Sequence, residues 1–320
     1  MGSICARESD LELSDPKWEA LPTEILVLIF RYLEQKELVQ TVNGVCQAWH
    51  NAAQTPSLWR RVALDIRLHQ RGRGWLGGLG ALDSLDVGGC QRLELQLFWA
   101  WLEGPAGARL SRLVFSPPAG EDVDAAIRLC PNLSLLAIKT FQPMDLEPFL
   151  TALKSLKFLR HVHLDIRSAS HSLSPFHNAF QGESGLSQLR SLSLDVGSVA
   201  RTLLQGILEA SPGLELLRLW NLELQLADYW LICCKLPKLR YLGVRLGKCM
   251  DSEDLTEPLM QDLLPQLRFL RIYSSTSQLD RAALERLKKQ RKGYIKVLGG
   301  DYDDDAHFFN HCYPEHDFSA

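Results

Sequence analysis

A short leucine phrase recurs along most of this chain, and it constrains the fold more than any other feature of the sequence. Each copy has the form Leu-x-x-Leu-x-apolar, and the clear copies begin at residues 110, 133, 159, 189, 214, 239 and 267. Successive copies begin 23 to 30 residues apart, with helical patterns between them. A weaker copy begins at Leu82, and Ile295-x-Val297 predicts a last strand. Each repeat is therefore expected to supply one short strand and one helix.

This spacing lies in or near the range of about 20–29 residues that is typical of leucine-rich repeats. One strand and one helix cannot bury their own apolar side, so stacked copies share a core and curve into an arc. The sequence thus predicts an α/β repeat fold, a leucine-rich-repeat solenoid with strands on the concave face and helices on the convex face. A loop or broken helix is expected in the long segment 165–188. Helices are expected at 122–129, 146–156, 199–210, 227–234, 255–263 and 280–289.

The segment before the repeats begins with a strongly apolar helical pattern. Pro22 favours a helix start there, because proline in the first turn gives up an N–H that would lack a partner anyway. One apolar stripe at helical spacing comprises Ile25, Leu28, Ile29, Tyr32 and Leu33, while Leu26, Val27 and Phe30 lie off it. A helix that is apolar nearly all round is usually buried on two sides. Since a small helical unit cannot easily bury both, the surplus face is expected to meet a partner chain or the next domain.

Two further short patterns follow this helix. Residues 37–50 predict two short helices that meet near Asn43-Gly44, because glycine weakens a helix. Pro56 then indicates a third turn, in which the large side chain of Trp59 is expected to hold the segment together by packing. Residues 21–62 are therefore expected to form a compact helical segment.

These residues resemble the F-box, the adaptor-binding motif of SCF-type ubiquitin ligases. The resemblance is carried by Leu21-Pro22-x-Glu24-Ile25, by Val45-Cys46-x-x-Trp49 and by Leu58-Trp59. It implies a set of positions that pack inside the F-box or against a Skp adaptor. The sequence leaves open which of them form the core and which contact the adaptor. A self-contained helical cap on the repeats is the alternative. The implied positions are Leu21, Pro22, Ile25, Leu26, Ile29, Leu33, Leu38, Val45, Cys46, Trp49 and Trp59.

With the repeats included, residues 20–298 resemble the F-box and leucine-rich-repeat proteins. The expected organisation is a flexible leader at 1–17, an F-box at 18–63, the repeat domain at 64–298 and an acidic-aromatic tail at 299–320. The resemblance implies a non-catalytic substrate-recognition subunit of an SCF-type (Skp-cullin-F-box) E3 ubiquitin ligase. Through the Skp adaptor it would join a cullin and a RING subunit, while the repeats hold a protein substrate for ubiquitination and proteasomal degradation. The alternative is a non-degradative scaffold that pairs with the adaptor.

Strand alternation predicts which side chains the concave face presents. The leucines of each phrase should point into the body of the arc and the x residues outward, so that equivalent x residues form three rows across the strands, with Trp220 next to Arg245 in the third row. Clusters of aromatic residues and arginine are typical of binding hot spots, so the last three strands are expected to dock the substrate, as a phosphorylated or acidic protein segment. The alternative is that the tail after residue 298 covers this patch. The patch comprises Leu216, Arg218, Trp220, Tyr241, Arg245, Phe269, Arg271 and Tyr273.

Composition narrows the remaining classes of function. A net charge of −3 and a pI near 6.3 give no overall electrostatic footprint for nucleic acid or an anionic membrane. The eight cysteines form no C-x-x-C pair, which favours reduced, buried thiols in a protein of the cytoplasm or nucleus. No stretch is long and apolar enough to span a membrane. We expect no catalytic residues and no cofactor.

Three weaker patterns remain as minor alternatives. Gly2 and Cys5 suggest lipidation, although Ala6 stands where the myristoylation pattern has serine or threonine. His161, His163 and Asp165 alternate along one strand, and His307, His311 and Cys312 are closely spaced, but exposed polar positions and a loose tail are the favoured interpretations of these two groups. The basic run 288–292 resembles a nuclear import patch, and a solvated helix end is the simpler explanation.

Overall fold

The structure is a computed structural model. It describes residues 18, 21–34, 37–38, 41–63, 82–87, 99, 102–116, 123–140, 146–166, 185–196, 201–246, 252–272, 281–290 and 296–299. The chain forms two compact units, Met1–Trp59 and Arg60–Ala320. The predicted leader at 1–17, most of the predicted tail and the lipidation candidates lie outside the described residues.

The first unit is helical. Its elements are α1 (Thr23–Phe30), η2 (Val42–Gly44), α3 (Gln47–Ala53) and η3 (Pro56–Trp59). Pro22 is the N-cap residue of α1, which confirms the predicted helix start. A 3-10 turn lies at Asn43-Gly44, where the sequence predicted two short helices to meet. The backbone N–H of Glu34 donates to Oε2 of Glu37 at 2.9 Å, which supports the turn after α1.

Aromatic side chains tie these helices together. The rings of Phe30 and Trp49 meet edge to face, with centroids 5.3 Å apart. Trp59 is buried, and its Nε1 donates a hydrogen bond to the carbonyl oxygen of Ala53 at 2.6 Å. The indole thus fills the core and also satisfies a carbonyl at the end of α3. The other buried core residues are Leu26, Val27, Leu38, Val42, Ala52 and Ala53.

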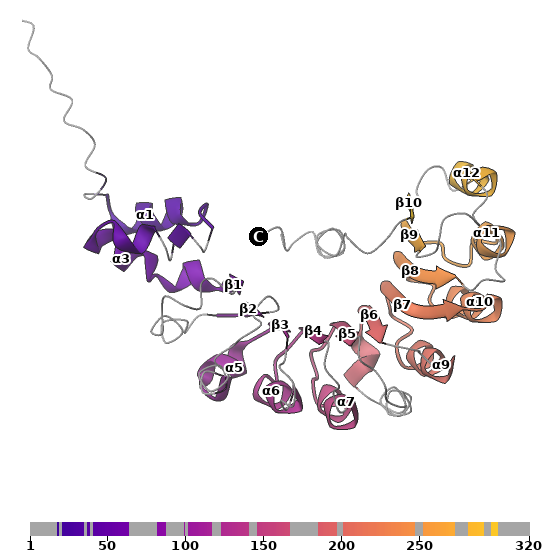
Figure 1. Ribbon diagram of the computed structural model, residues 1–320, viewed down its shortest axis with the longest axis horizontal. Coiled ribbons are helices and arrows are strands. Elements are labelled where there is room, and N and C mark those ends of the chain that lie inside the picture. Colours follow the sequence, from indigo (N-terminus) through magenta and orange to yellow (C-terminus); the bar gives the residue numbers. More distant parts are fainter. Residues whose placement is uncertain are drawn as a thin grey trace, which may run out of the picture. The chain divides into compact units, whose positions relative to one another are not determined.

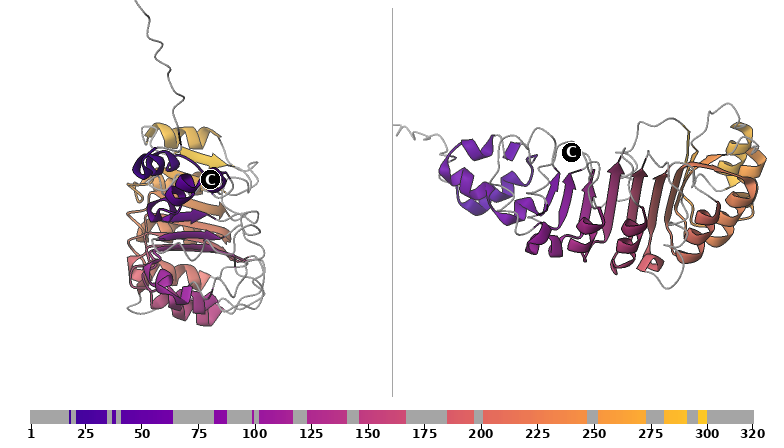
Figure 2. Two further views of the ribbon diagram at one scale, coloured as in Figure 1. Left: turned by 90° about the vertical axis from the view of Figure 1, so that its left-hand side faces the viewer. Right: turned by 60° about the horizontal axis from the view of Figure 1, so that its bottom comes forward.

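The second unit is built on one parallel sheet in which sequence order and spatial order agree from β1 to β10. Helices follow the strands and lie on one side of the sheet (Figures 1 and 2). The strands are β1 (Arg61–Ala63), β2 (Ser84–Val87), β3 (Arg112–Phe115), β4 (Leu135–Thr140), β5 (His161–Ile166), β6 (Ser191–Val196), β7 (Leu216–Leu224), β8 (Tyr241–Leu246), β9 (Phe269–Ile272) and β10 (Lys296–Gly299).

The helical elements between these strands agree with the predicted ranges to within a few residues. The described part of the irregular segment 165–188 contains the end of β5 and the short η5. Neither α5 nor β1 was predicted from the sequence, because these elements are only five and three residues long. The helical elements are α5 (Pro105–Arg109), α6 (Val123–Leu129), α7 (Leu146–Lys154), η5 (Gly185–Gln188), α9 (Arg201–Ala210), α10 (Leu226–Lys235), α11 (Ser252–Met260) and α12 (Arg281–Gln290).

The leucine phrases form the core of this arc. In the phrase that begins at Leu133, the three apolar positions Leu133, Leu136 and Ile138 have no exposed surface. Equivalent leucines pair across strands, as Leu113 does with Leu136, so every repeat adds a layer in the same phase. Because each layer covers the apolar side of its neighbour, the core is continuous along the sheet. The predicted solenoid, with strands on the inner side and helices on the outer side, is confirmed (Figure 1).

Gly107 lies at a point where two neighbouring repeats pack closely together. A Cβ atom at this position would collide with the carbonyl oxygens of Leu102 and Leu129, the latter at the end of α6. Backbone atoms cannot move aside as a flexible side chain can. Gly213 differs, since a Cβ there would approach the carbonyl oxygen of Leu189 no closer than 4.0 Å.

We predict that Gly107→Ala lowers the free energy of unfolding by about 2 kcal/mol, because the added methyl group forces backbone shifts in a packed region. Urea unfolding followed by circular dichroism measures the change. Gly213→Ala is the matched control and should unfold near the wild-type midpoint. Equal midpoints for the two variants would contradict the close approach at Gly107.

The described cysteines are free thiols that differ in burial. Cys130 and Cys233 are buried, Cys46 is partly buried and Cys234 is exposed. Burial raises the pKa of the Cys130 and Cys233 thiols to about 12. Since the thiolate is the reactive form, these two residues act as small apolar groups of the core.

We predict that a thiol reagent at pH 8 modifies Cys234 in the folded protein and leaves its neighbour Cys233, as well as Cys130, unmodified. Peptide mapping by mass spectrometry separates the three sites, and labelling in urea is the positive control. Because the raised pKa favours the neutral thiol in the folded state, the two buried cysteines stabilise the fold below pH 9 and lose this contribution as the pH rises towards about 12. Labelling of Cys130 in the folded protein would refute their burial.

Candidate functional site: an apolar helix face and the inner side of the sheet

One side of α1 leaves large apolar side chains in solvent. Ile25, Leu28 and Ile29 are 42%, 50% and 39% exposed, and Tyr32, just after the helix, is 92% exposed. Their spacing of three and four residues places them on one side, called here the α1 face. Val45, in the turn before α3, is 49% exposed as well.

The other side of α1 packs into the first unit. Leu26, Val27 and Phe30, which lie off the predicted stripe, are the buried residues of this helix. The surplus apolar surface expected from the sequence is thus the stripe itself. Exposed apolar clusters of this kind are typical of interaction sites.

The eleven positions that the F-box resemblance implied divide into three groups by burial. Leu26, Leu38 and Trp59 are buried and belong to the core of the unit. Four positions are exposed, namely Pro22, Ile25, Ile29 and Val45, and four are partly buried, namely Leu21, Leu33, Cys46 and Trp49. Leu28 and Tyr32 were not among the predicted positions, although their helical spacing from Ile25 already pointed to the same face.

The inner side of the sheet has the register that the sequence predicted in its first two rows. The first row pairs in the order Arg112, Leu135, His161, Ser191, Leu216, Tyr241 and Phe269. The second row pairs in the order Val114, Ala137, His163, Ser193, Arg218, Gly243 and Arg271.

The third row is interrupted between β7 and β8. Leu219 pairs with Val244, but the next partner of β8 is Glu223, which lies opposite Arg245. The prediction that Trp220 occupies this row opposite Arg245 is therefore wrong. The shift between Leu219 and Glu223 breaks the alternation on which the prediction relied.

The predicted exposure of the substrate patch is also largely wrong. Leu216 and Tyr241 are buried and pack together with Phe269, and the two rings lie 6.4 Å apart. Arg218 and Arg271 are only 1% and 8% exposed. Large side chains on neighbouring strands bury one another, since strands lie only about 4.8 Å apart. Within this patch Arg245 alone is exposed among the described side chains, and those of Trp220 and Tyr273 lie outside them.

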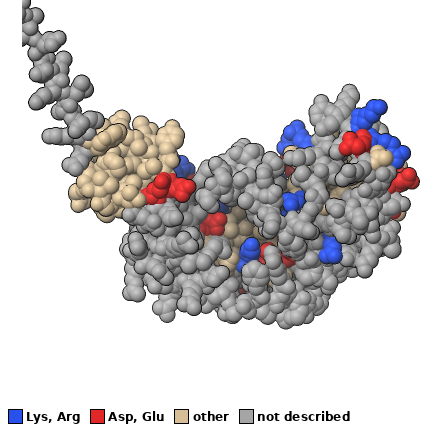
Figure 3. Space-filling model, turned by 45° about the horizontal axis from the view of Figure 1, so that its top comes forward, with Lys and Arg blue, Asp and Glu red and all other residues tan. Residues whose placement is uncertain are grey.

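Charged groups are also buried further along the inner side. Asp165 and Asp195 pair in register on β5 and β6 and are both buried, so Asp165 is not the exposed position that the sequence suggested. Among the described residues no group of three His, Cys, Asp or Glu side chains is placed to hold a metal ion. Within the same residues, no helix combines the length and apolar character needed to cross a membrane. In Figure 3, which is turned so that this side comes forward, described basic and acidic side chains lie next to one another.

We predict that Arg218→Ala lowers the free energy of unfolding by about 3 kcal/mol, because truncating a large and fully buried side chain leaves a cavity in the packed structure. Arg245→Ala removes the same side chain from an exposed position on β8 and should leave stability within about 0.5 kcal/mol of wild type. Denaturant unfolding of both variants measures the difference. A solvent-exposed Arg218 would make the two variants equally stable.

Comparisons with known proteins agree with this architecture. An F-box-like family model matches residues 18–65. F-box/LRR-repeat protein 5 from Salmo salar is 44% identical over 55 residues, which are 17% of this chain and 8% of that protein. F-box protein FBW2 from Arabidopsis thaliana is 26% identical over 250 residues, covering 72% of this chain and 75% of that one.

The salmon protein is thus matched over less than a tenth of its length. Among solved structures, the leucine-rich repeat-containing protein LegL7 from Legionella pneumophila is 15% identical with a TM-score of 0.38, over 78% of this chain and 96% of that one. The F-box-like match falls on the helical unit and on the start of the sheet, and in-phase leucine layers follow it. The chain thus combines a region that matches the F-box-like family with a sheet of stacked leucine-rich repeats.

Proposed function

We propose that this chain is the substrate receptor of an SCF-type E3 ubiquitin ligase, with the first unit binding a Skp adaptor. The supporting observation is the α1 face, which exposes Ile25, Leu28, Ile29 and Tyr32 within a domain that matches the F-box family. Burying these side chains against an apolar groove of the adaptor would release ordered water and favour association. The adaptor would connect the chain to a cullin and a RING subunit.

The repeat unit would then hold the protein to be modified. The ligase chemistry would belong to the other subunits, and this chain would contribute proximity and orientation, which speed a reaction without catalytic residues of the receptor. Ubiquitination of the bound protein would lead to its degradation by the proteasome. A scaffold that pairs with the adaptor alone would share the α1 face but would not join a cullin.

We predict that Leu28→Glu/Ile29→Glu weakens binding of the Skp adaptor at least tenfold, because two carboxylates would be forced into an apolar interface. Co-purification of the two proteins and calorimetric titration measure the loss. Both side chains are exposed, so the substitutions leave the core of the unit intact. Gln54→Glu, at an exposed position just after α3, is the control and should bind as wild type does.

Unchanged adaptor binding by the double variant, with circular dichroism showing a folded protein, would refute the proposed interface. The cullin distinguishes receptor from scaffold. We expect the wild-type chain to recover a cullin together with the adaptor, and the double variant to lose both. Recovery of the adaptor without the cullin would favour the scaffold.

A further inference from the structure

One position in every leucine phrase forms a ladder along the edge where the strands begin. It is the residue directly after the first leucine, and its backbone N–H donates to the carbonyl of its equivalent in the preceding repeat. The distances are 2.8 Å from Arg190 to Arg160, 2.8 Å from Glu215 to Arg190, 2.7 Å from Arg240 to Glu215 and 2.9 Å from Arg268 to Arg240. Neighbours in such a ladder lie about 4.8 Å apart. These five residues, Arg160, Arg190, Glu215, Arg240 and Arg268, are called here the strand-start strip.

The strip is strongly basic and exposed. Four guanidinium groups accompany a single carboxylate, that of Glu215, which is shared by its two neighbours. Arg190 Nη1 lies 3.6 Å from Glu215 Oε1, and Arg240 Nη1 lies 3.6 Å from Glu215 Oε2. The side chains of Arg190 and Arg240 remain 55% and 49% exposed. One carboxylate cannot neutralise this row, so the edge keeps an excess of positive charge.

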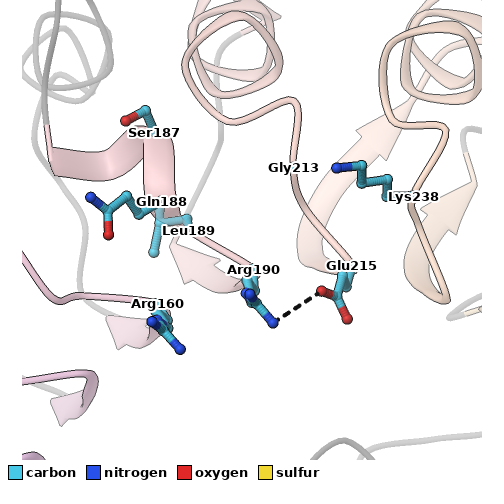
Figure 4. Close-up of a pocket in the computed structure, with 8 residues that line it drawn as sticks. All are labelled: Arg160, Ser187, Gln188, Leu189, Arg190, Gly213, Glu215 and Lys238. Carbon is cyan, nitrogen blue, oxygen red and sulfur yellow. Dashed lines mark ion pairs between the residues drawn. The ribbon is translucent and has the colours of Figure 1, made fainter.

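A pocket of about 290 Å³ opens on this edge (Figure 4). Arg160 and Arg190 line one part of it, and Lys238 extends from the loop before β8. Gly213 leaves the space between them free of a side chain. Within the described part of the chain, Arg160 and Lys238 form no ion pair. The lining residues are Arg160, Ser187, Gln188, Leu189, Arg190, Gly213, Glu215 and Lys238.

The earlier repeats show that the fold itself does not need these arginines. At the same position β3 and β4 are preceded by Ser111 and Ser134, whose hydroxyls donate to the carbonyls of the preceding repeat at 3.0 Å. Short side chains that satisfy local backbone groups are thus sufficient at this edge. Exposed ion pairs contribute little to stability, about 0–1 kcal/mol each. Like charges in such a row repel one another. Binding of a ligand therefore explains the row better than stability of the fold does.

The dimensions and chemistry fit an extended acidic peptide. Four steps of about 4.8 Å give a row of about 19 Å, which about six residues of extended chain would span. Guanidinium groups bind carboxylates through two parallel hydrogen bonds. Charges distributed along a row match a series of carboxylates better than one phosphate group. A nucleic-acid strand carries a phosphate at every nucleotide and would have to bring one past Glu215 at the centre of the row, whereas a peptide can place an uncharged residue there.

We propose that the strand-start strip docks an extended segment, rich in Asp and Glu, of a partner protein, with one carboxylate in the pocket between Arg160, Arg190 and Lys238. The strip lies at the edge of the sheet, apart from the inner-side patch built on Leu216, Tyr241 and Phe269. This inference rests on the proposed function in so far as the partner is the protein to be modified. Adaptor binding by the first unit is a separate property and can be measured separately.

The test is fluorescence anisotropy at low salt with a labelled peptide of alternating glutamate and glycine, long enough to span the strip, and the full chain. Arg160→Glu/Lys238→Glu reverses two charges of the pocket and should weaken binding more than tenfold. Gly213→Glu keeps every cation and places a competing carboxylate in the pocket, where a Cβ is tolerated. It should weaken binding as well.

The matched control is Arg286→Glu/Lys289→Glu, the same change in charge at two exposed positions of α12. Equal weakening by the control would overturn the proposal, as would unchanged binding by the pocket variant. Tighter binding of a single-stranded RNA, or of a neutral peptide with one phosphoserine, would also overturn it. All variants should still co-purify with the Skp adaptor, so a loss confined to the peptide tests the strip and not the proposed function.

Discussion

The pairing of each strand with its equivalent in the preceding repeat is the constraint on which the second unit depends. Because the hydrogen bonds join equivalent residues, every position of the leucine phrase becomes a row that runs across the sheet. The leucine rows form the core, and the rows between them form the inner side. The row that begins the strands gathers Arg160, Arg190, Arg240 and Arg268 along one edge. A residue type that recurs at the same position of several phrases is thereby brought together on one surface.

The first unit shows how a small domain distributes apolar side chains between its core and a potential interface. Phe30 and Trp49 pack together, and Trp59 caps a carbonyl of α3, so the unit gains a core from few residues. The core does not bury the α1 face, which stays exposed. Its exposure carries no benefit for the isolated unit, since apolar surface in water raises the free energy of the folded state. A partner that covers this face is the physical reason proposed for retaining it.

The inner side and the strand-start edge differ in what they offer a partner. On the inner side the large residues of β7, β8 and β9 bury one another, and Arg218 is buried with them. On the edge, side chains project beyond the ends of the strands, where no neighbouring row covers them. Aromatic residues and arginine on adjacent strands indicated a binding surface from the sequence. Their mutual burial makes the patch largely a part of the packed structure.

The sequence by itself determined the solenoid, the order of its strands and the first two rows of the inner side, because a leucine phrase in constant phase leaves one way to stack the repeats. It also determined that α1 has more apolar surface than the unit can bury. Only the tertiary structure decided which side of α1 is buried, since Leu26 and Ile25 are equally apolar and packing against α3 selects between them. The shift that places Glu223 opposite Arg245 was likewise invisible to alternation. Burial of Arg218 and exposure of Arg160 follow from neighbours that are distant in sequence, and no local pattern encodes these.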